Sequence, residues 1–531
     1  MLLSWNIVNP SLSFILSRVQ SVCSNILHMS ESSSSTLNIA VEGCCHGELD
    51  KIYESVIQAS KTGPPVDLLL ICGDFQCVRY MSDFDSVAVP AKYRHVKNFQ
   101  EYVSGKKVAP VMTIFIGGNH EASNILQSLY YGGFVAPNIY FLGFAGVVWY
   151  GGVRISGLSG IFNESHYRSG RFEYPPYTDA SVRSVYHLRE VEVYRMAHLK
   201  ASRFPVDIFL SHDWPAGIVD YGNRQYLLRK KPYFREDVET GKLGSPPLMN
   251  LLQMLRPSYW FAAHLHVKFM ATVQHPPPFN HQNGSSSQSH SSSSSVAVFV
   301  PTSSSIDRPP LPPGPPPPPP PLQASSFAPP AVTRFLALDK VLPGRPFIEF
   351  LRVPRQRTVG DEARMQLSYD LEWLAVLRRT HGLTKFTRGN VSVPDSIQPV
   401  SDQELAEVEQ LIRQSNHGDL TIQNIEPTGD SDLGNKKPRV DDGLFCEPVR
   451  MGNPQTDMLL GALGLNHICT VPHTLLSSVP VQSETSSAAI TATGAPLFVN
   501  SNSISSRASE VAASVVAVAG NDPNEISLDD D

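Results

Sequence analysis

The fold class is indicated by one stretch of the chain, Val66-Asp67-Leu68-Leu69-Leu70-Ile71-Cys72-Gly73-Asp74. A short, nearly continuous apolar run of this kind is typical of a strand that is buried on both faces. The run stops at Gly73 and is followed at once by the carboxylate of Asp74. Open α/β sheets bind their ligands at the carboxyl ends of strands. The stretch therefore predicts an α/β sheet with a ligand site where its strands end.

Other stretches repeat this arrangement, in which an apolar run stops at small residues and then presents polar side chains. They are residues 37–41, 111–116, 206–210 and 259–263. Helices are expected between the strands, at residues 49–60 and 182–199, and a further strand is expected at residues 333–339. This alternation of strands and helices is typical of the α/β class.

Side chains that commonly bind metals follow these strands. They are Cys44, His46, Asp74, Asn119, His212, His264 and His266. Carboxylate, amide and imidazole ligands together suit Mn²⁺, Fe²⁺ or Zn²⁺. Seven ligands are too many for one ion that keeps open positions, so two ions sharing Asp74 are expected. A two-metal site about 3.5–4 Å across can hold a bridging hydroxide and clamp a phosphate for in-line attack. His120 is not needed as a ligand and is the candidate general acid.

Five sequence blocks carry a resemblance to a known family. They are Gly-Cys-Cys-His-Gly (43–47), Gly-Asp-Phe-Gln (73–76), Gly-Gly-Asn-His-Glu (117–121), Ser-His-Asp-Trp-Pro (211–215) and Ala-His-Leu-His-Val (263–267). They resemble the calcineurin-like metallophosphoesterases and, more narrowly, the RNA lariat debranching enzymes. The resemblance covers residues 37 to about 275, resumes at 333 and continues weakly to about 465. It implies a two-sheet α/β sandwich flanked by helices, with a small debranching-specific C-terminal domain.

The resemblance also implies an activity. Such an enzyme hydrolyses the 2′–5′ phosphodiester at the branch of excised intron lariat RNA in the nucleus, which linearises the intron for turnover. The seven residues above would be ligands for one or two divalent ions, and His120 would protonate the leaving 2′-oxygen. Cys44 stands where the wider superfamily has an aspartate. A thiol favours the softer ions Zn²⁺ or Fe²⁺, and it leaves open whether Cys44 binds metal and whether both pockets fill.

Residues 162–177 match the segment that this family uses as a lariat-recognition loop. The residues implied to contact the substrate are Tyr167, Arg168, Arg171, Phe172, Tyr174 and Tyr177. Aromatic rings stack on the bases of single-stranded RNA and arginines contact its phosphates. The composition of the loop therefore suits branched RNA.

The composition of the chain divides it into segments. An N-terminal extension (1–36) precedes the metallophosphoesterase domain (37–275), whose final strands (331–353) follow a disordered Ser/Pro-rich insertion (276–330). The C-terminal debranching domain (354–470) and a disordered tail with an acidic end (471–531) complete the expected organisation. The proline run of the insertion is expected to be extended, and it is a candidate ligand for a proline-recognition module.

Composition excludes several functional classes. The chain has 531 residues, a net charge of −6 and seven cysteines without repeated spacing. No apolar run is long enough for a transmembrane helix, and no disulfide framework is indicated. We therefore expect no membrane partner and a reducing compartment. Two alternatives to debranching stay open, namely another calcineurin-like phosphoesterase and a catalytically silent adaptor that binds branched RNA.

Overall fold

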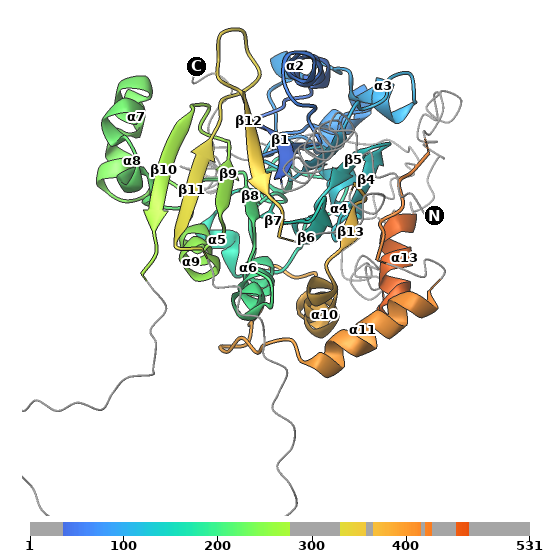
Figure 1. Ribbon diagram of the computed structural model, residues 1–531. Helices are drawn as coiled ribbons and strands as arrows, with labels where there is room; N and C mark the ends of the chain where they lie inside the picture. Colours follow the sequence, from blue (N-terminus) through green and yellow to red (C-terminus); the bar gives the residue numbers. More distant parts are fainter. Residues whose placement is uncertain (1–35, 277–329, 357–364, 416–419, 427–452, 467–531) are drawn as a thin grey trace, which may run out of the picture.

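The computed structural model describes residues 36–276, 330–356, 365–415, 420–426 and 453–466. Two sheets form the centre of the molecule (Figure 1). The first has six strands in the order β12-β1-β2-β3-β5-β4, and the second has seven in the order β10-β11-β9-β8-β7-β6-β13. The prediction of a two-sheet α/β sandwich flanked by helices is thereby confirmed.

The first sheet has a parallel centre. Strands β1, β2, β3 and β5 are parallel, while β12 and β4 pair antiparallel at its two edges. The register aligns Glu42, Ile71 and Phe115, so that β1, β2 and β3 end side by side. The strands are β1 (Thr36–Glu42), β2 (Leu68–Ile71), β3 (Met112–Phe115), β4 (Gly133–Ala136), β5 (Ile139–Phe141) and β12 (Ile348–Pro354).

The second sheet also has a parallel centre, formed by β7, β8, β9 and β11. Strands β10, β6 and β13 pair antiparallel at its margins. The 277–329 segment connects β10 to β11, so the Ser/Pro-rich stretch joins the two strands of a hairpin. The strands are β6 (Ala145–Tyr150), β7 (Val153–Leu158), β8 (Ile208–Ser211), β9 (Tyr259–Ala262), β10 (Phe269–Gln274), β11 (Val332–Ala337) and β13 (Ser368–Tyr369).

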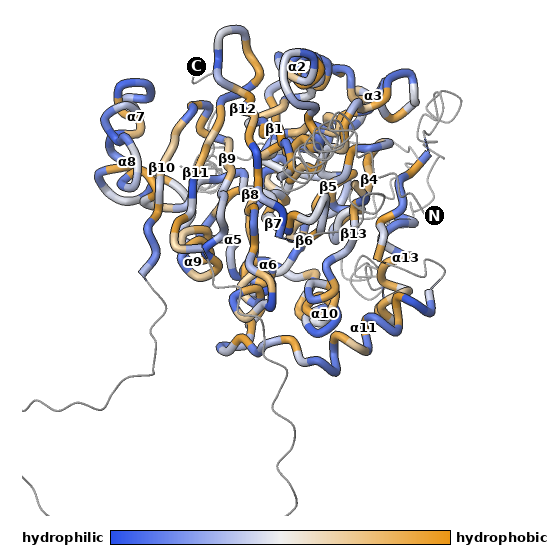
Figure 2. Tube along the Cα trace, in the orientation of Figure 1, coloured by the Kyte–Doolittle hydropathy of each residue, from blue (hydrophilic) through white to orange (hydrophobic). Residues whose placement is uncertain are grey.

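Apolar side chains from both sheets meet in one buried layer. Val41 and Leu70 of the first sheet belong to the same buried cluster as Ile155, Leu210 and Phe261 of the second. A second cluster joins the outer faces of the sheets to the helices. The central strands are accordingly among the hydrophobic parts of the chain (Figure 2). Burial on both faces explains why these strands are nearly continuous apolar runs.

Helices cover the sandwich. In Figure 1, α2 and α3 lie together at the top and α10, α11 and α13 at the lower right. The helices are α2 (Leu49–Thr62), α3 (Phe99–Val103), α4 (Ser123–Ser128), α5 (Glu164–Tyr167), α6 (Glu190–Ala197), α7 (Arg224–Lys230), α8 (Arg235–Glu239), α9 (Pro246–Leu255), α10 (Leu371–Thr380), α11 (Asp402–Gln414) and α13 (Pro454–Ala462). No helix in these described ranges is long and apolar enough to cross a membrane.

The helix predicted at 182–199 is wrong in its first half. Helix α6 begins only at Glu190, and a single 3₁₀ turn occupies Ser181–Arg183. The stretch between them is held in place from outside, because the Leu188 amide donates to the carbonyl oxygen of Ile161 at 2.9 Å. The Arg189 side chain also pairs with Glu173 at 2.6 Å. These tertiary contacts override the local helical tendency.

The C-terminal part packs on the sandwich through several contacts. Strand β13 extends the second sheet beside β6. The side-chain amide of Gln455 on α13 accepts from the Phe134 amide at 2.7 Å and donates to the Phe134 carbonyl at 2.9 Å. In the predicted helix 402–414, Val408 and Ile412 are buried, and Ser401 caps its first turn. The N-terminal extension, most of the Ser/Pro-rich insertion and the tail lie outside the described residues.

Candidate metal centre and active site

The predicted ligand residues converge where β1, β2, β3, β8 and β9 end. The side chains of Cys44, His46, Asp74 and His266 place their ligand atoms within 4.8 Å of one another. Asn119, His212 and His264 lie beside them. The Asn119 amide oxygen is 3.2 Å from His212 Nε2, and the His212 and His264 ring centres are 5.0 Å apart. All of these residues are buried except His46, which is partly exposed.

Several of these residues have an unusual backbone. His46, Asp74, His264 and His266 have φ values of 45°, 48°, 66° and 47°. Non-glycine residues in this left-handed region each cost about 1–3 kcal/mol, and such strain clusters at functional sites. The surrounding fold holds these four residues in strained turns after the strands, and the ligand atoms of His46, Asp74 and His266 there lie within 4.8 Å of one another.

Asp74 stands between two groups of ligands. Its Oδ2 atom is 3.7 Å from His46 Nε2, and its Oδ1 atom is 3.4 Å from His212 Nε2. Residue 118 packs so closely against the Asp74 carboxylate that it must be glycine, since a Cβ atom there would lie 2.2 Å from Asp74 Oδ1. Burial alone would raise the pKa of Asp74, but the charges of His212 and His120 hold it well below its usual range. Asp74 is therefore ionised and can serve both groups.

The group around His212 has the electrostatics of a cation site. His212 Nδ1 lies 2.8 Å from the Cys72 carbonyl, which can only accept, so this nitrogen carries a hydrogen. In the neutral ring the Nε2 lone pair then faces the Asn119 and Asp74 oxygens at 3.2 and 3.4 Å. Converging lone pairs repel unless a positive charge lies among them. Burial alone would lower the pKa of His212, but the Asp74 charge raises it above its usual value, so the site favours a positive charge at this position. The donor set therefore fits a divalent ion.

The group around His46 contains sulfur as well as nitrogen and oxygen. His46 and His266 face each other through their Nε2 atoms at 3.5 Å. The Cys44 sulfur accepts a hydrogen bond from the His264 backbone amide at 3.2 Å. Burial raises the pKa of the Cys44 thiol, and the Asp74 charge raises it further. A thiolate here therefore requires a bound cation, which agrees with a metal pocket of mixed ligands.

His120 is buried at the edge of the two groups. Its Nδ1 atom lies 2.9 Å from the Ala88 carbonyl oxygen, so Nδ1 carries a hydrogen and donates. Its Nε2 atom lies 3.2 Å from the Asn119 side-chain nitrogen and its ring centre 5.7 Å from that of His46. The predicted acid thus lies beside the ligands with its Nε2 atom toward Asn119.

Two residues that hold the site together were not singled out from the sequence. Glu121 accepts hydrogen bonds from the amides of Phe75, Gln76 and Gly118 at 2.8, 2.8 and 3.0 Å, and so ties two ligand loops together. The side-chain nitrogen of Gln76 is 3.3 Å from His46 Nδ1. Both residues lie inside the sequence blocks that carry the resemblance, and this position is the signal in the sequence that could have identified them.

Loop 162–177 begins at the metal centre. The Gly160 amide donates to the Gly117 carbonyl at 2.8 Å, and the Phe162 amide donates to the Asp213 carboxylate at 3.2 Å. Asp213 follows His212 directly. Of the side chains implied to contact substrate, Arg168 and Tyr174 are exposed and Tyr167 is partly buried. Tyr177 is partly buried and its hydroxyl donates to Gln127.

Arg171 and Phe172 lie elsewhere than the predicted substrate contacts require. The Arg171 side chain is buried, pairs with Glu192 at 3.3 Å and donates to the Val185 carbonyl at 2.6 Å. The Phe172 ring lies beneath two guanidinium groups, those of Arg189 at 5.5 Å and Arg388 at 4.9 Å. Both side chains are thus in contact with other parts of the protein, which favours a role in holding the loop in place over direct contact with substrate.

Comparisons with known proteins agree with this architecture. A family model described as "Calcineurin-like phosphoesterase" matches residues 37–268, and one described as "Lariat debranching enzyme, C-terminal domain" matches residues 330–468. The second match includes β11 and β12, which pair within the two sheets.

Curated relatives agree over most of the chain. A "Lariat debranching enzyme" of Arabidopsis thaliana is 42% identical over 451 residues, covering 84% of this chain and 89% of the relative. One of Drosophila melanogaster is 47% identical over 450 residues, covering 82% and 79%. One of Homo sapiens is 47% identical over 361 residues, which is 68% of this chain and 57% of the human protein. The chain thus spans little more than half the length of some relatives.

Proposed function

The chain belongs to the lariat debranching enzyme family, and from this premise we propose that it hydrolyses the 2′–5′ phosphodiester at the branch of excised intron lariat RNA. One observation supports the proposal most strongly. The chain combines a cluster of metal-ligand side chains at its strand ends with the C-terminal part described for debranching enzymes. The products would be a linear RNA with a 5′-phosphate and a free 2′-hydroxyl at the branch. The comparisons do not favour the alternatives of another phosphoesterase or a silent adaptor.

We propose that the site binds one or two divalent ions, Mn²⁺, Fe²⁺ or Zn²⁺. Cys44, His46, Asp74 and His266 would hold one ion, and Asp74 would share the second with Asn119, His212 and His264. When bound, such ions polarise a phosphate and lower the pKa of water so that it can act as a nucleophile. The converging lone pairs at His212 and the buried thiol of Cys44 support this assignment. Sulfur at Cys44 favours Zn²⁺ or Fe²⁺ in its pocket.

His120 is proposed as the general acid. The Ala88 carbonyl accepts a hydrogen bond from Nδ1, which leaves Nε2 as the ring nitrogen that faces the site. The proton that the leaving 2′-oxygen needs would be carried on Nε2, once the Asn119 side-chain nitrogen, which here can only donate to that atom at 3.2 Å, gives up this contact. The side chain is 4% exposed, so bulk water has little access to that proton. His120 would thus protonate the oxygen as the phosphorus–oxygen bond breaks.

The experiment compares full-length wild type, His120→Ala and His95→Ala on a synthetic 2′–5′ branched RNA with added Mn²⁺. His95 is exposed and serves as the matched control. Wild type and His95→Ala should cleave only the branch bond, whereas His120→Ala should be about 10²–10⁴-fold slower while still binding. A phosphoserine peptide and a cyclic nucleotide are assayed in parallel. Hydrolysis of either one without cleavage of the branch would refute the debranching assignment.

Two further proposals concern the cellular setting. We propose a nuclear location, since the substrate is an excised intron, and a partner module that recognises the proline-rich stretch within 276–330. That stretch and a basic cluster at 436–439 lie almost entirely outside the described residues, so both proposals rest on the sequence. Imaging of the protein with and without residues 436–439, and peptide binding by the proline stretch, would test them.

A further inference from the structure

Loop 162–177 does not stand alone, because a segment of the C-terminal part pairs with it along its edge. The Arg171 amide donates to the Lys385 carbonyl at 2.9 Å, and the Val391 amide donates to the Arg168 carbonyl at 2.8 Å. The contact is close enough to require glycine at position 170, where a Cβ atom would lie 2.4 Å from the Lys385 oxygen. Loop 162–177 and segment 385–391 therefore form one surface.

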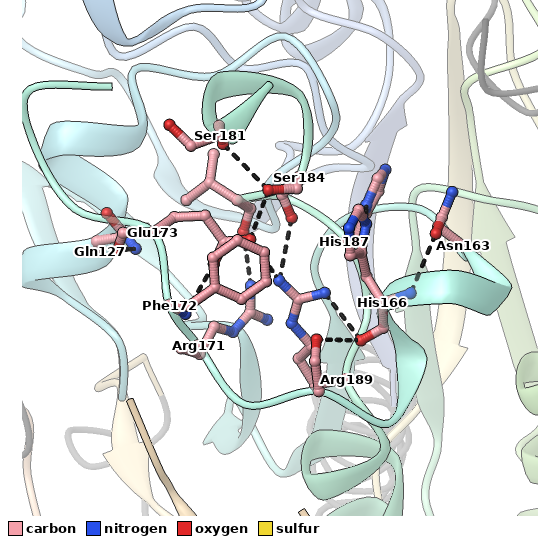
Figure 3. A network of polar contacts seen from close by, with 12 residues as sticks. Gln127, Asn163, His166, Arg171, Phe172, Glu173, Ser181, Ser184, His187 and Arg189 are labelled. Carbon is pink, nitrogen blue, oxygen red and sulfur yellow. Dashed lines mark hydrogen bonds and ion pairs between the residues drawn. The ribbon is translucent and has the colours of Figure 1, made fainter. Parts of the chain in front are cut away.

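On the inner side of this surface, the buried charged side chains are paired with partners of opposite charge. Figure 3 shows Arg189 between Glu173, Ser184 and the His166 carbonyl oxygen. Arg189 pairs with Glu173 at 2.6 Å, and Arg171 pairs with Glu192 at 3.3 Å. All four charged side chains are buried. Two cations facing two anions leave no net charge here, so this network supports the loop and attracts no RNA.

The outer side carries an excess of positive charge. Arg168, Lys385 and Arg388 are exposed, and none has an ion-pair partner in the part of the chain that the structure describes. Arg388 is held over the Phe172 ring at 4.9 Å, which fixes its position without neutralising it. The partly buried acid Glu190 lines the same small cavity as Arg168 and Lys385. Glu164 at the start of the same loop is exposed as well, so three cations stand against two anions, and the remaining positive charge favours a polyanionic ligand.

This charged surface lies close to the metal centre. Phe162 contacts Asp213 beside His212, and Arg168 is six positions further along the chain. Fully extended, six residues reach about 20 Å, and helix α5 shortens that path. An RNA arm of a few nucleotides leaving the metal centre can therefore reach Lys385 and Arg388.

We propose that segment 385–391 is part of the substrate site, with Lys385 and Arg388 binding phosphates of an RNA arm next to the branch. This inference rests on the proposed debranching function and names a binding region within the C-terminal part of the chain. Phosphate contacts of this kind add affinity and orient the strand without reading its sequence. Arg388 offers a planar fork over an aromatic ring and Lys385 a mobile point charge.

The test uses full-length Lys385→Gln/Arg388→Gln and a matched double variant, Lys61→Gln/Arg413→Gln, which loses the same charge from exposed positions on α2 and α11. Binding of branched RNA is measured in the presence of a chelator, so that no turnover occurs, across a range of salt concentrations.

The Lys385→Gln/Arg388→Gln variant should bind a long-armed branched RNA roughly tenfold more weakly than wild type. The slope of log Kd against log salt concentration should fall by about 1.4, at about 0.7 for each single-strand phosphate contact. A minimal branched trinucleotide should bind equally well. The variant Lys385→Gln/Arg388→Lys restores one of the two charges and should recover part of the lost salt slope. Such a recovery separates the loss of charge from a disturbed loop.

The outcomes separate the two levels of the proposal. If wild type cleaves branched RNA but both double variants bind it like wild type at every salt concentration, segment 385–391 does not contact RNA, while debranching stands. An equal loss with the minimal trinucleotide would also overturn the inference, because the damage would then lie at the metal centre. If wild type neither binds nor cleaves branched RNA, the debranching function itself fails.

Discussion

The buried guanidinium of Arg154 donates two hydrogen bonds, of 2.9 and 2.8 Å, to the carboxylate of Asp370. Arg154 lies on β7 in the sandwich, and Asp370 caps α10 in the C-terminal part by accepting from the Trp373 amide. One carboxylate therefore joins the two family-model regions and begins a helix. The Arg154 side chain has no exposure to solvent, so its charge depends on this partner.

Asp370→Ala should consequently destabilise the protein by about 3–5 kcal/mol, because it leaves a buried cation without its main counter-charge. The free energy of unfolding, from urea titration, measures the effect. The half-exposed pair Arg378–Glu407 provides the control, and Glu407→Ala should cost no more than about 1 kcal/mol. Similar losses for the two variants would show that the buried pair does not join the regions as inferred.

A proton-donor role of His120 can be distinguished from general damage to the active site by comparing two substrates whose leaving groups differ in their need for a proton. A nitrophenyl phosphodiester releases a stable anion that needs no proton. His120→Ala should therefore lose about 10²–10⁴-fold on branched RNA but less than about tenfold on the nitrophenyl substrate. His212→Ala should lose activity on both, because it removes a proposed ligand. Equal losses for His120→Ala on the two substrates would exclude a proton-donor role.

Asp74 should matter more for metal content than any other single ligand, since each of its oxygens faces a different group. After equilibration with limiting Zn²⁺ or Mn²⁺ and removal of free ions, Asp74→Asn should retain less metal than Cys44→Ala or Asn119→Ala. Elemental analysis measures the ions bound per chain. Identical metal content in the three variants would contradict the shared position of Asp74.

The strands and the ligands were predictable from sequence for the same reason. Strands buried on both faces must be apolar throughout, so each run is visible, and its end marks where a ligand can stand. The predicted helix 402–414 matches α11, because Ser401 caps it and its apolar residues recur at helical spacing.

The surroundings of Arg171 show where sequence reasoning fails. Arg171 lies in a basic, aromatic loop, and that composition suggested contact with RNA. Its burial depends on Glu192, which is 21 residues away, and on segment 385–391, which is more than 200 residues away. Pairings over such separations have no local pattern in the sequence. Contacts of the same kind, from Leu188 to Ile161 and from Arg189 to Glu173, keep the residues before Glu190 out of the helix and delay the start of α6.

Asp207 should give the protein a pH-dependent stability. Burial raises the pKa of this carboxyl to about 7, although the Arg154 amide and Gln356 donate hydrogen bonds to it. Between about pH 4 and 7 the folded form then binds more protons than the unfolded form, so stability contributed by Asp207 falls as pH rises. Unfolding midpoints across this interval should therefore decline more steeply in wild type than in Asp207→Asn. Asp395→Asn, at an exposed position, is the control and should follow wild type. Parallel curves for wild type and Asp207→Asn would contradict the raised pKa.

Glu173 should influence substrate binding without touching substrate. Its carboxylate accepts from Arg189 and from Ser184 at 2.6 Å, and from the Phe172 amide at 3.1 Å. Glu173→Gln leaves the two buried arginines facing Glu192 alone, which should loosen loop 162–177 and the surface that it shares with segment 385–391. We expect KM for branched RNA to rise while turnover of the nitrophenyl phosphodiester, which does not reach the loop, stays near wild type. Glu164→Gln removes an exposed negative charge from the same loop without touching the buried network, so it should not raise KM and should leave turnover of the nitrophenyl substrate unchanged. A fall in turnover of both substrates would instead mean that Glu173 supports the metal centre itself, and the loop would then not be a separate support for RNA.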